Sequence, residues 1–233
     1  MAGKETQIDG LQIKWIDHST VQLKDSQGKV IYIDPFSKVL KGDEEKADLI
    51  VSTHPHFDHF DPGAINRLLK PETEVVAKKG CDLGQLKTTK AREIEVGEEL
   101  EVQGVKIKAV EAYNEHRFRS PGQPFHPKGL GMGVVLEVEG KKLYYAGDTD
   151  SIPEMASLKE EALDVAFLPI GGTYTMDRGG RGGGKDPAED HRPHALQLPL
   201  RDAGRSGKAQ GEGGTAGDRG ADPVTSLPFK GFS

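Results

Sequence analysis

Short apolar runs rich in β-branched residues dominate the first two thirds of the chain. This pattern is typical of β-strands. We expect strands at residues 11–16, 20–23, 30–33, 49–51, 74–77, 105–110, 133–138, 142–146 and 163–168. Apolar and polar residues alternate in the run 105–110, which predicts a strand with one face in the core and the other in solvent.

Turn and helix signals separate these runs. Gly28 and the pair Glu139-Gly140 indicate hairpin turns. Asp61 followed by Pro62 predicts the start of a helix, with Asp61 as the N-cap and Pro62 in the first helical position. The buried stripe of this helix is predicted to contain Ile65, Leu68 and Leu69.

The composition limits the classes of partner. The 233 residues fit one domain, with 35% hydrophobic and 29% charged residues and a formal net charge of −6. An acidic chain has no general attraction to nucleic acid or to anionic membranes. No run approaches the roughly 18 apolar residues of a membrane span, and no apolar signal segment follows the N-terminus. Cys81 is the only cysteine, which excludes an internal disulfide and fits a reducing compartment. We therefore expect a cytoplasmic protein, and its oligomeric state stays open.

One six-residue segment carries most of the candidate chemistry. The sequence HPHFDH at residues 54–59 places three imidazoles and a carboxylate directly after the apolar run 49–51. Borderline divalent ions take these ligands, and a loop that leaves a buried strand holds them rigidly. A polar surface loop that is rich in histidine by chance is the alternative interpretation. The crowding of ligand types favours a metal site.

The H-x-H-x-D-H pattern resembles the signature of the metallo-β-lactamase superfamily. The resemblance runs from residue 11 to residue 176, and is greatest to small metal-dependent hydrolases related to ascorbate-6-phosphate lactonases. The matching segments are residues 15–19, 33–36, 124–129, 145–150 and 169–176. The resemblance implies an α/β fold of the αββα sandwich type, in which two sheets pack together with helices outside. The C-terminal part of that fold is expected to be missing or disordered here.

The same resemblance implies two divalent ions, Zn²⁺ or Mn²⁺. It assigns His54 and His56 to the first metal site, and Asp58 and His59 to the second. Asp148 follows the predicted strand 142–146 and corresponds to the carboxylate that bridges the two ions. A turn aspartate that caps its neighbours is the structural alternative for Asp148.

The third imidazole of the first site has two candidates. His126 is preferred because a glycine-rich turn and two strands separate it from Asp148, as in the family; the competitor, His116, lies in a sequence typical of an exposed loop. Asp34 is predicted to orient a ligand histidine rather than to bind metal. His18 is predicted either to reach the rim of the pocket or to have a structural role. Thr173, Tyr174 and Thr175 are candidates for the pocket wall.

The composition changes at Arg178. The last 56 residues contain 13 of the 30 glycines and only two aromatic residues, Phe229 and Phe232. We expect a hydrolase domain at residues 1–177 and a tail at 178–233 that cannot bury enough apolar surface to offset its ordering entropy. This tail is either naturally disordered or translated out of frame.

The genetic code favours the second explanation. Codons for residues 194–199, read one base later, permit Met-His-Tyr-Asn-Tyr-Leu, and the family carries a Pro-Met-His-Tyr-like run there whose histidine is a metal ligand. The same shift permits a helix-forming sequence at 179–185, then a terminal strand, and a stop codon near 224–225. One extra G near Arg178 would produce the shift. His194 lies beside the expected ligand position without its context, so the second metal site is predicted to be incomplete.

The resemblance implies a metal-dependent hydrolase in which a metal-bound hydroxide attacks an ester, lactone or phosphodiester. Asp58 is the predicted catalytic residue, which orients the nucleophile and accepts its proton. A small-molecule substrate is expected, and activity is expected to be impaired by the incomplete second site. The alternatives are a nuclease or phosphodiesterase of the same superfamily, and an inactive metal-binding or partner-binding protein.

Overall fold

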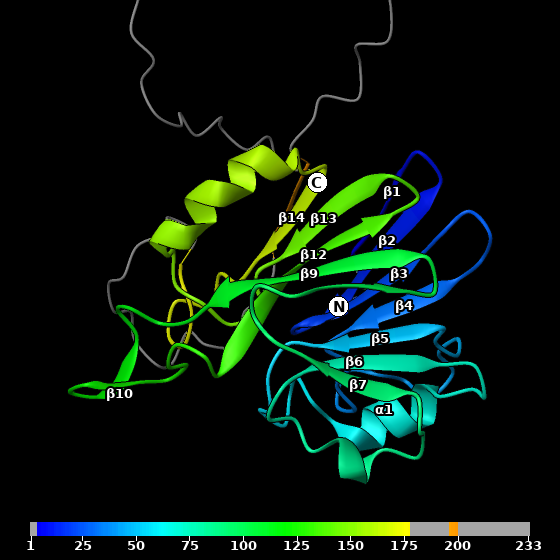
Figure 1. Cartoon of the computed structure of the whole chain (residues 1–233), viewed down its shortest axis with the longest axis horizontal. Coiled ribbons are helices and arrows are strands. Elements are labelled where there is room, and N and C mark those ends of the chain that lie inside the picture. The colour runs from blue at the N-terminus through cyan, green and yellow to red at the C-terminus, as the bar shows by residue number, and fades with distance from the viewer. Residues whose placement is uncertain (1–3, 178–195, 200–233) are drawn as a thin grey trace, which may run out of the picture. The chain divides into compact units, whose positions relative to one another are not determined.

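Two β-sheets form the centre of the protein in a computed structural model that describes residues 4–177 and the backbone of residues 196–199 (Figure 1). The first sheet has the order β1-β2-β3-β4-β5-β6-β7 and consists of β1 (Lys4–Ile8), β2 (Leu11–Asp17), β3 (Thr20–Lys24), β4 (Val30–Ile33), β5 (Leu49–Ser52), β6 (Glu74–Lys78) and β7 (Ala91–Ile94). The second sheet has the order β15-β14-β13-β12-β9-β8 and consists of β8 (Glu99–Val102), β9 (Val105–Ala112), β12 (Gly131–Val138), β13 (Lys141–Tyr145), β14 (Val165–Leu168) and β15 (Leu196–Pro199).

The remaining elements lie outside these sheets. Strands β10 (Phe118–Ser120) and β11 (Gln123–Pro124) form a separate hairpin. The helical elements are α1 (Pro62–Leu68), the short 3-10 turn η1 (Leu83–Gln85) and the longer 3-10 helix η2 (Pro153–Glu161). No helix within the described ranges is long and apolar enough to cross a membrane.

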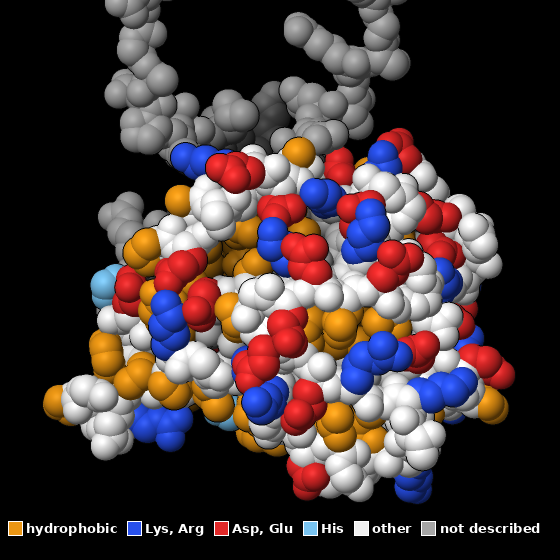
Figure 2. All heavy atoms as spheres, viewed as in Figure 1, with side chains coloured by type: hydrophobic (Ala, Val, Ile, Leu, Met, Phe, Trp, Pro, Cys, Tyr) orange, Lys and Arg blue, Asp and Glu red, His pale blue; other side chains and the backbone are white. Residues whose placement is uncertain are grey.

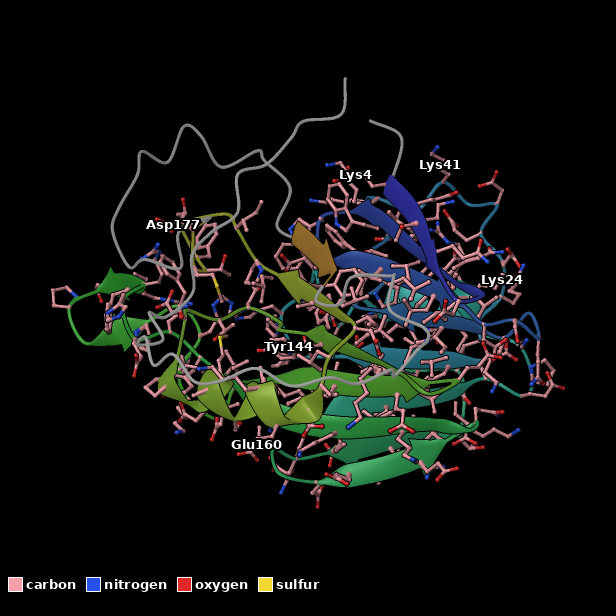
Figure 3. All side chains as sticks on the ribbon, turned by 90° about the horizontal axis from the view of Figure 1, so that it is seen from above. Lys4, Lys24, Lys41, Tyr144, Glu160 and Asp177 are labelled. Carbon is pink, nitrogen blue, oxygen red and sulfur yellow. The ribbon has the colours of Figure 1, made fainter. Side chains whose placement is uncertain are left out.

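Three apolar clusters give the order of the layers. The largest lies between the two sheets, where residues such as Ile13, Val51 and Leu136 interdigitate. A second cluster packs α1, through Ala64, Ile65 and Leu68, against the outer face of the first sheet. A third lies on the outer face of the second sheet, where η2 covers Tyr144, labelled in Figure 3. The expected αββα sandwich is confirmed, with the difference that a 3-10 helix forms the outer layer over the second sheet.

The change from antiparallel to parallel pairing positions the candidate site. Strands β1 to β4 pair antiparallel, whereas β4, β5, β6 and β7 pair parallel. The carboxyl ends of β4 and β5 therefore meet at one sheet edge, which brings Asp34 beside the motif at 54–59. Reactive groups at the carboxyl ends of parallel strands are a general property of such sheets.

The local turn and helix signals are confirmed. The Asp61 carboxylate accepts hydrogen bonds from the backbone N–H groups of Gly63 and Ala64, at 2.8 and 3.1 Å, so it is the N-cap of α1. Gly28 and Gly140 have the positive φ angles, +85° and +76°, that tight hairpins require. The helix ends at Leu68, so the predicted stripe residue Leu69 is the C-cap and only partly buried.

Five strands within residues 4–177 were not predicted, namely β1, β7 and β8 of the two main sheets and β10 and β11 of the separate hairpin. Strand β1 extends the folded region N-terminal to residue 11 by pairing with β2, although its side chains are largely exposed. Strand β15, which lies within the segment 178–233, was also not predicted. It pairs antiparallel with β14. The rest of that segment, including His194, lies outside the described residues, so its out-of-frame origin stays a prediction.

Candidate metal centre

The C-terminal end of β5 holds His54 rigidly at the sheet edge. The backbone N–H of Thr53 donates to Asp34 Oδ1 at 2.8 Å, and the Thr53 hydroxyl donates to Asp34 Oδ2 at 2.7 Å. The same hydroxyl lies 3.1 Å from His54 Nδ1, which leaves Nε2 of this buried ring for the site. The Met132 N–H donates to the Thr53 carbonyl at 3.1 Å, so β12 fixes this segment from the facing sheet.

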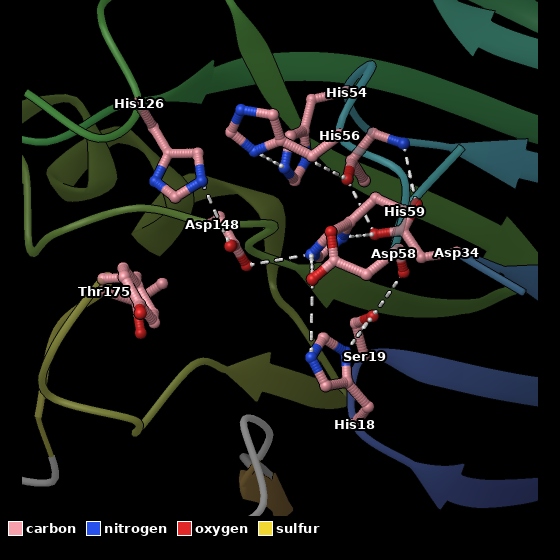
Figure 4. Close-up of polar contacts among 12 residues, drawn as sticks. His18, Ser19, Asp34, His54, His56, Asp58, His59, His126, Asp148 and Thr175 are labelled. Atoms are coloured by element: carbon pink, nitrogen blue, oxygen red, sulfur yellow. Dashed lines mark hydrogen bonds and ion pairs between the residues drawn. The ribbon is translucent and has the colours of Figure 1, made fainter. Parts of the chain in front are cut away.

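Three imidazoles converge there in what we call the three-histidine cluster, His54, His56 and His126 (Figure 4). His54 Nε2 lies 3.1 Å from His56 Nδ1, and the His126 ring centroid is about 5 Å from both other rings, at 5.2 and 4.9 Å. His126 Nδ1 lies 2.9 Å from Asn114 Oδ1 and donates its proton to this acceptor. The His126 Nε2 lone pair is thereby free for a metal ion.

A second group, which we call the mixed cluster, consists of His18, Asp58 and His59. His59 Nδ1 lies 2.7 Å from Asp34 Oδ2, so the predicted contact between Asp34 and a candidate ligand histidine is present. His59 Nε2 is buried without a hydrogen-bond partner; its nearest carboxylate oxygens are on Asp148 at 3.5 Å and Asp58 at 3.9 Å. A buried polar atom without a partner is costly, and a cation bound there would remove that cost.

Asp148 connects the two clusters. Its Oδ2 lies 3.2 Å from His126 Nε2, and its Oδ1 lies 3.5 Å from His59 Nε2. The preceding residue, Gly147, has φ +65°, and a Cβ there would lie 2.6 Å from the Met132 carbonyl oxygen. Only glycine fits this approach, which explains the sequence Gly147-Asp148.

The donor spacing fits divalent ions. Two nitrogen or oxygen ligands at roughly 2.0–2.1 Å from a tetrahedral ion are roughly 3.4 Å apart. The separations that involve Asp148 are 3.2 and 3.5 Å, and the His54–His56 separation is 3.1 Å. Neutral imidazole and carboxylate donors suit Zn²⁺, and carboxylate oxygen also suits Mn²⁺.

The pKa shifts separate neutral from charged groups. Burial lowers the pKa of His54 well below its ordinary value, and it also lowers the pKa of His56. Burial acts in the same direction on His59, but the carboxylates of Asp148 and Asp34 outweigh it and raise the His59 pKa well above its ordinary value. Burial would raise the pKa of Asp148, yet His59 and the other imidazoles hold it well below its usual range. His54 and His56 are thus neutral and ready for a metal, whereas a metal at His59 must displace a proton.

The other predicted site residues have different surroundings. His116 is exposed, and its backbone N–H donates to Asp150 Oδ2 at 2.7 Å. It belongs to none of the metal-ligand groups among the described residues. Thr175 is buried and lies near Asp148 in Figure 4, whereas Tyr174 is 41% exposed and Thr173 half-buried.

Two contributors were not found from the sequence, Asn114 and Tyr145. The Asn114 amide N–H donates to the Tyr174 carbonyl at 3.0 Å, which orients its oxygen towards His126. The Tyr145 hydroxyl lies 2.8 Å from the Ser19 carbonyl oxygen and 3.1 Å from Asp34 Oδ2. A lone asparagine has no sequence pattern that marks it as part of a site. The pattern around Tyr145 predicts a core residue of β13 as well as it predicts a site residue.

The two facing sheets, with imidazoles and carboxylates at one edge, define a metal-dependent hydrolase of the metallo-β-lactamase fold. The model of the β-lactamase superfamily domain matches residues 12–180. A UPF0173 metal-dependent hydrolase of Thermus thermophilus is 33% identical over 172 residues, which cover 71% of this chain and 74% of the relative. A UPF0173 metal-dependent hydrolase of Thermoplasma acidophilum is 32% identical over 179 residues, which cover 73% and 75%.

Solved structures of metal-dependent hydrolases share this fold. A protein of Parabacteroides distasonis, described as a candidate metal-dependent hydrolase, aligns with a TM-score of 0.63 and 33% identity over 75% of this chain and 77% of its own. Igni18, a metallo hydrolase of the archaeon Ignicoccus hospitalis, aligns with a TM-score of 0.55 and 29% identity over 72% and 73%. The chain belongs to the metallo-β-lactamase superfamily and, within it, to the UPF0173 metal-dependent hydrolases.

Proposed function

We propose that this protein hydrolyses a small ester, lactone or phosphodiester with two divalent ions, Zn²⁺ or Mn²⁺, held by the three-histidine cluster and the mixed cluster. The observation that carries the proposal is the position of Asp148. Its Oδ2 faces His126 of the three-histidine cluster, and its Oδ1 faces His59 of the mixed cluster. Such ions lower the pKa of a bound water and polarise the carbonyl or phosphoryl oxygen of a substrate.

The protein's own groups fix the geometry and handle the proton. Asn114 and Asp34 each accept the outer N–H of a ligand histidine, so both rings keep their orientation while substrate binds. The Asp58 side chain is 23% exposed and lies at the mouth of the site, with Oδ2 facing His18 and His59. We propose that Asp58 orients the nucleophile and accepts its proton.

The rim of the site favours a small anionic substrate with an apolar part. Phe57, between His56 and Asp58 in the motif, is 69% exposed. The Lys38 ammonium lies 5.8 Å from the centre of that ring, so an apolar surface and a positive charge adjoin. Acidic and basic side chains are interspersed on the face in Figure 2, which does not favour nucleic acid. A cytoplasmic location fits the single, buried thiol of Cys81.

Hydrolysis of two activated substrates tests the proposal. The purified chain, loaded with Zn²⁺ or Mn²⁺, is assayed with an activated lactone or ester and with bis-p-nitrophenyl phosphate, alongside His54→Ala and His116→Ala. We expect turnover that a chelator abolishes, that His54→Ala removes and that His116→Ala retains. Turnover is expected to rise further when the reading frame after Arg178 is restored, because the second site gains its family histidine. Bound metal without turnover of either substrate would instead identify an inactive metal-binding protein.

A further inference from the structure

His18 occupies a strained position in the tight turn between β2 and β3. Its φ is +50°, in the left-handed region that few residues other than glycine adopt, although asparagine, aspartate and histidine do so more often than the rest. Two hydrogen bonds hold its backbone: its N–H donates to Asp17 Oδ1 at 2.8 Å, and the Trp15 indole N–H donates to its carbonyl at 2.8 Å. Strain of this kind persists where the surroundings impose it, and it concentrates at functional sites.

The hydrogen bonds around the ring are compatible with the tautomer that a metal ligand needs. The Ser19 hydroxyl donates its only proton to the Asp58 carbonyl oxygen at 3.3 Å. Ser19 Oγ lies 2.9 Å from His18 Nδ1 and, with its own proton donated to Asp58, can accept the Nδ1 proton. In that tautomer His18 Nε2 carries a lone pair, and this atom faces Asp58 of the mixed cluster.

A lone pair and a carboxylate face each other across the cluster. His18 Nε2 lies 3.5 Å from Asp58 Oδ2, too far for a good direct hydrogen bond and close to the roughly 3.4 Å between two ligands of one tetrahedral ion. Two acceptors at this distance repel each other unless a proton or a metal ion lies between them. His59 Nε2, which lacks a hydrogen-bond partner, completes a triangle whose ligand atoms all lie within 4.8 Å of one another.

We propose that His18 Nε2 is a ligand of the second metal ion. The inference rests on the proposed function, since it concerns one of its two metal sites. His18, Asp58 and His59 then provide three protein donors of a tetrahedral ion, and the fourth position is open to water or substrate. The second site of this chain would thus receive an imidazole from the β2–β3 turn, whichever reading frame follows Arg178.

Metal binding by the intact chain tests the assignment. The variant His18→Gly removes the imidazole and tolerates the left-handed backbone, and His18→Asn tolerates it as well. We expect two Zn²⁺ per chain in the wild type and one in both variants, with the second ion bound at least about 100-fold more weakly. His116→Gly, which removes an exposed histidine outside both clusters, should retain two ions. Thermal melts of each metal-free variant confirm folding, and the visible spectrum of the Co²⁺ form gives a second readout.

The outcomes separate this inference from the proposed function. Two tightly bound ions in both His18 variants, with an unchanged Co²⁺ spectrum, would show that His18 is structural and overturn the inference. A single ion in the wild type, lost on His54→Ala, would also overturn it while the three-histidine site stood. No bound ion in the wild type would contradict the proposed function itself.

Discussion

The three-histidine cluster and the mixed cluster share one edge of the sandwich but differ in burial and charge. In the three-histidine cluster His54 and His126 are buried and His56 is partly exposed, whereas in the mixed cluster only His59 is buried. The side chains of His18 and Asp58 are 25% and 23% exposed. The first cluster consists of imidazoles alone; the second contains a carboxylate and lies at the solvent boundary. Ligands whose rotamers are locked by packing bind an ion with little reorganisation, so we expect the three-histidine cluster to bind its ion more tightly.

The groups that hold the imidazoles of the two clusters also differ in charge. Neutral acceptors hold the three-histidine cluster, through the amide of Asn114 and the hydroxyl of Thr53. A buried carboxylate, Asp34, holds His59 in the mixed cluster. A carboxylate behind an imidazole makes it more basic, which strengthens its metal bond and also its competition for a proton. The two sites should therefore respond differently to ligand loss, charge loss and pH.

Loss of His54 is expected to have the largest effect. The variant His54→Ala removes a central imidazole that faces both His56 and His59. We expect at least about 100-fold weaker binding of the tighter ion and loss of metal-dependent turnover. Metal analysis after gel filtration measures it, with His116→Ala as the control. Equal occupancy in the two variants would contradict the assignment of the first site.

Neutralising Asp34 should affect the mixed cluster more than the other. Its Oδ2 accepts from the Thr53 hydroxyl and lies 2.7 Å from His59 Nδ1 and 3.1 Å from the Tyr145 hydroxyl. In Asp34→Asn an amide cannot accept at both oxygen positions, so we expect a loss of about 1–3 kcal/mol of stability. Binding of the second ion should weaken about 10–100-fold.

Tyr145→Phe is the matched control for Asp34→Asn, because it removes the hydroxyl that contacts Asp34 and the Ser19 carbonyl and keeps the carboxylate. About 1 kcal/mol of stability should be lost, with little change in metal affinity. Denaturant unfolding and metal competition on both variants give the comparison. If Tyr145→Phe weakened the second ion as much as Asp34→Asn, general destabilisation would be the cause.

Much of this architecture could be predicted from the sequence because its signals are local. The buried strand β5, the motif at 54–59 and the Asp61 N-cap depend on neighbouring residues alone. Strand β1 could not be predicted, since its exposed residues carry no apolar pattern and it exists through pairing with β2. The orientation of His18 depends on a left-handed turn and a hydroxyl contact from Ser19, and neither has a sequence signature.

The pH dependence of the two ions is expected to differ. The His59 pKa is raised in the metal-free protein, so the second ion must displace a proton, and its affinity should fall by up to about tenfold per unit as pH falls. The His54 and His56 pKa values are lowered, so these rings stay neutral and the first ion responds less. Calorimetric titrations at pH 7.5 and 6.0, in buffers of different ionisation enthalpy, measure the proton release. Equal proton release for both ions would remove the distinction.

A change remote from both clusters should have the smallest effect on metal. Asp61→Ala removes the N-cap of α1 and is expected to cost about 1 kcal/mol of stability. Metal affinity should be unchanged, because none of the metal-ligand groups among the described residues includes Asp61. A thermal melt and a metal titration check both statements. A clear loss of bound metal would mean that the α1 layer controls the site, contrary to this account.

Anomalous X-ray scattering from crystals grown with Zn²⁺ tests the central claim most directly. We expect two peaks at the sheet edge. One should lie among His54, His56 and His126, and the other among His18, Asp58 and His59, with Asp148 between them. The peak in the mixed cluster should weaken first as Zn²⁺ is withdrawn. A single peak, or a peak beside His116 with none in the three-histidine cluster, would contradict the account.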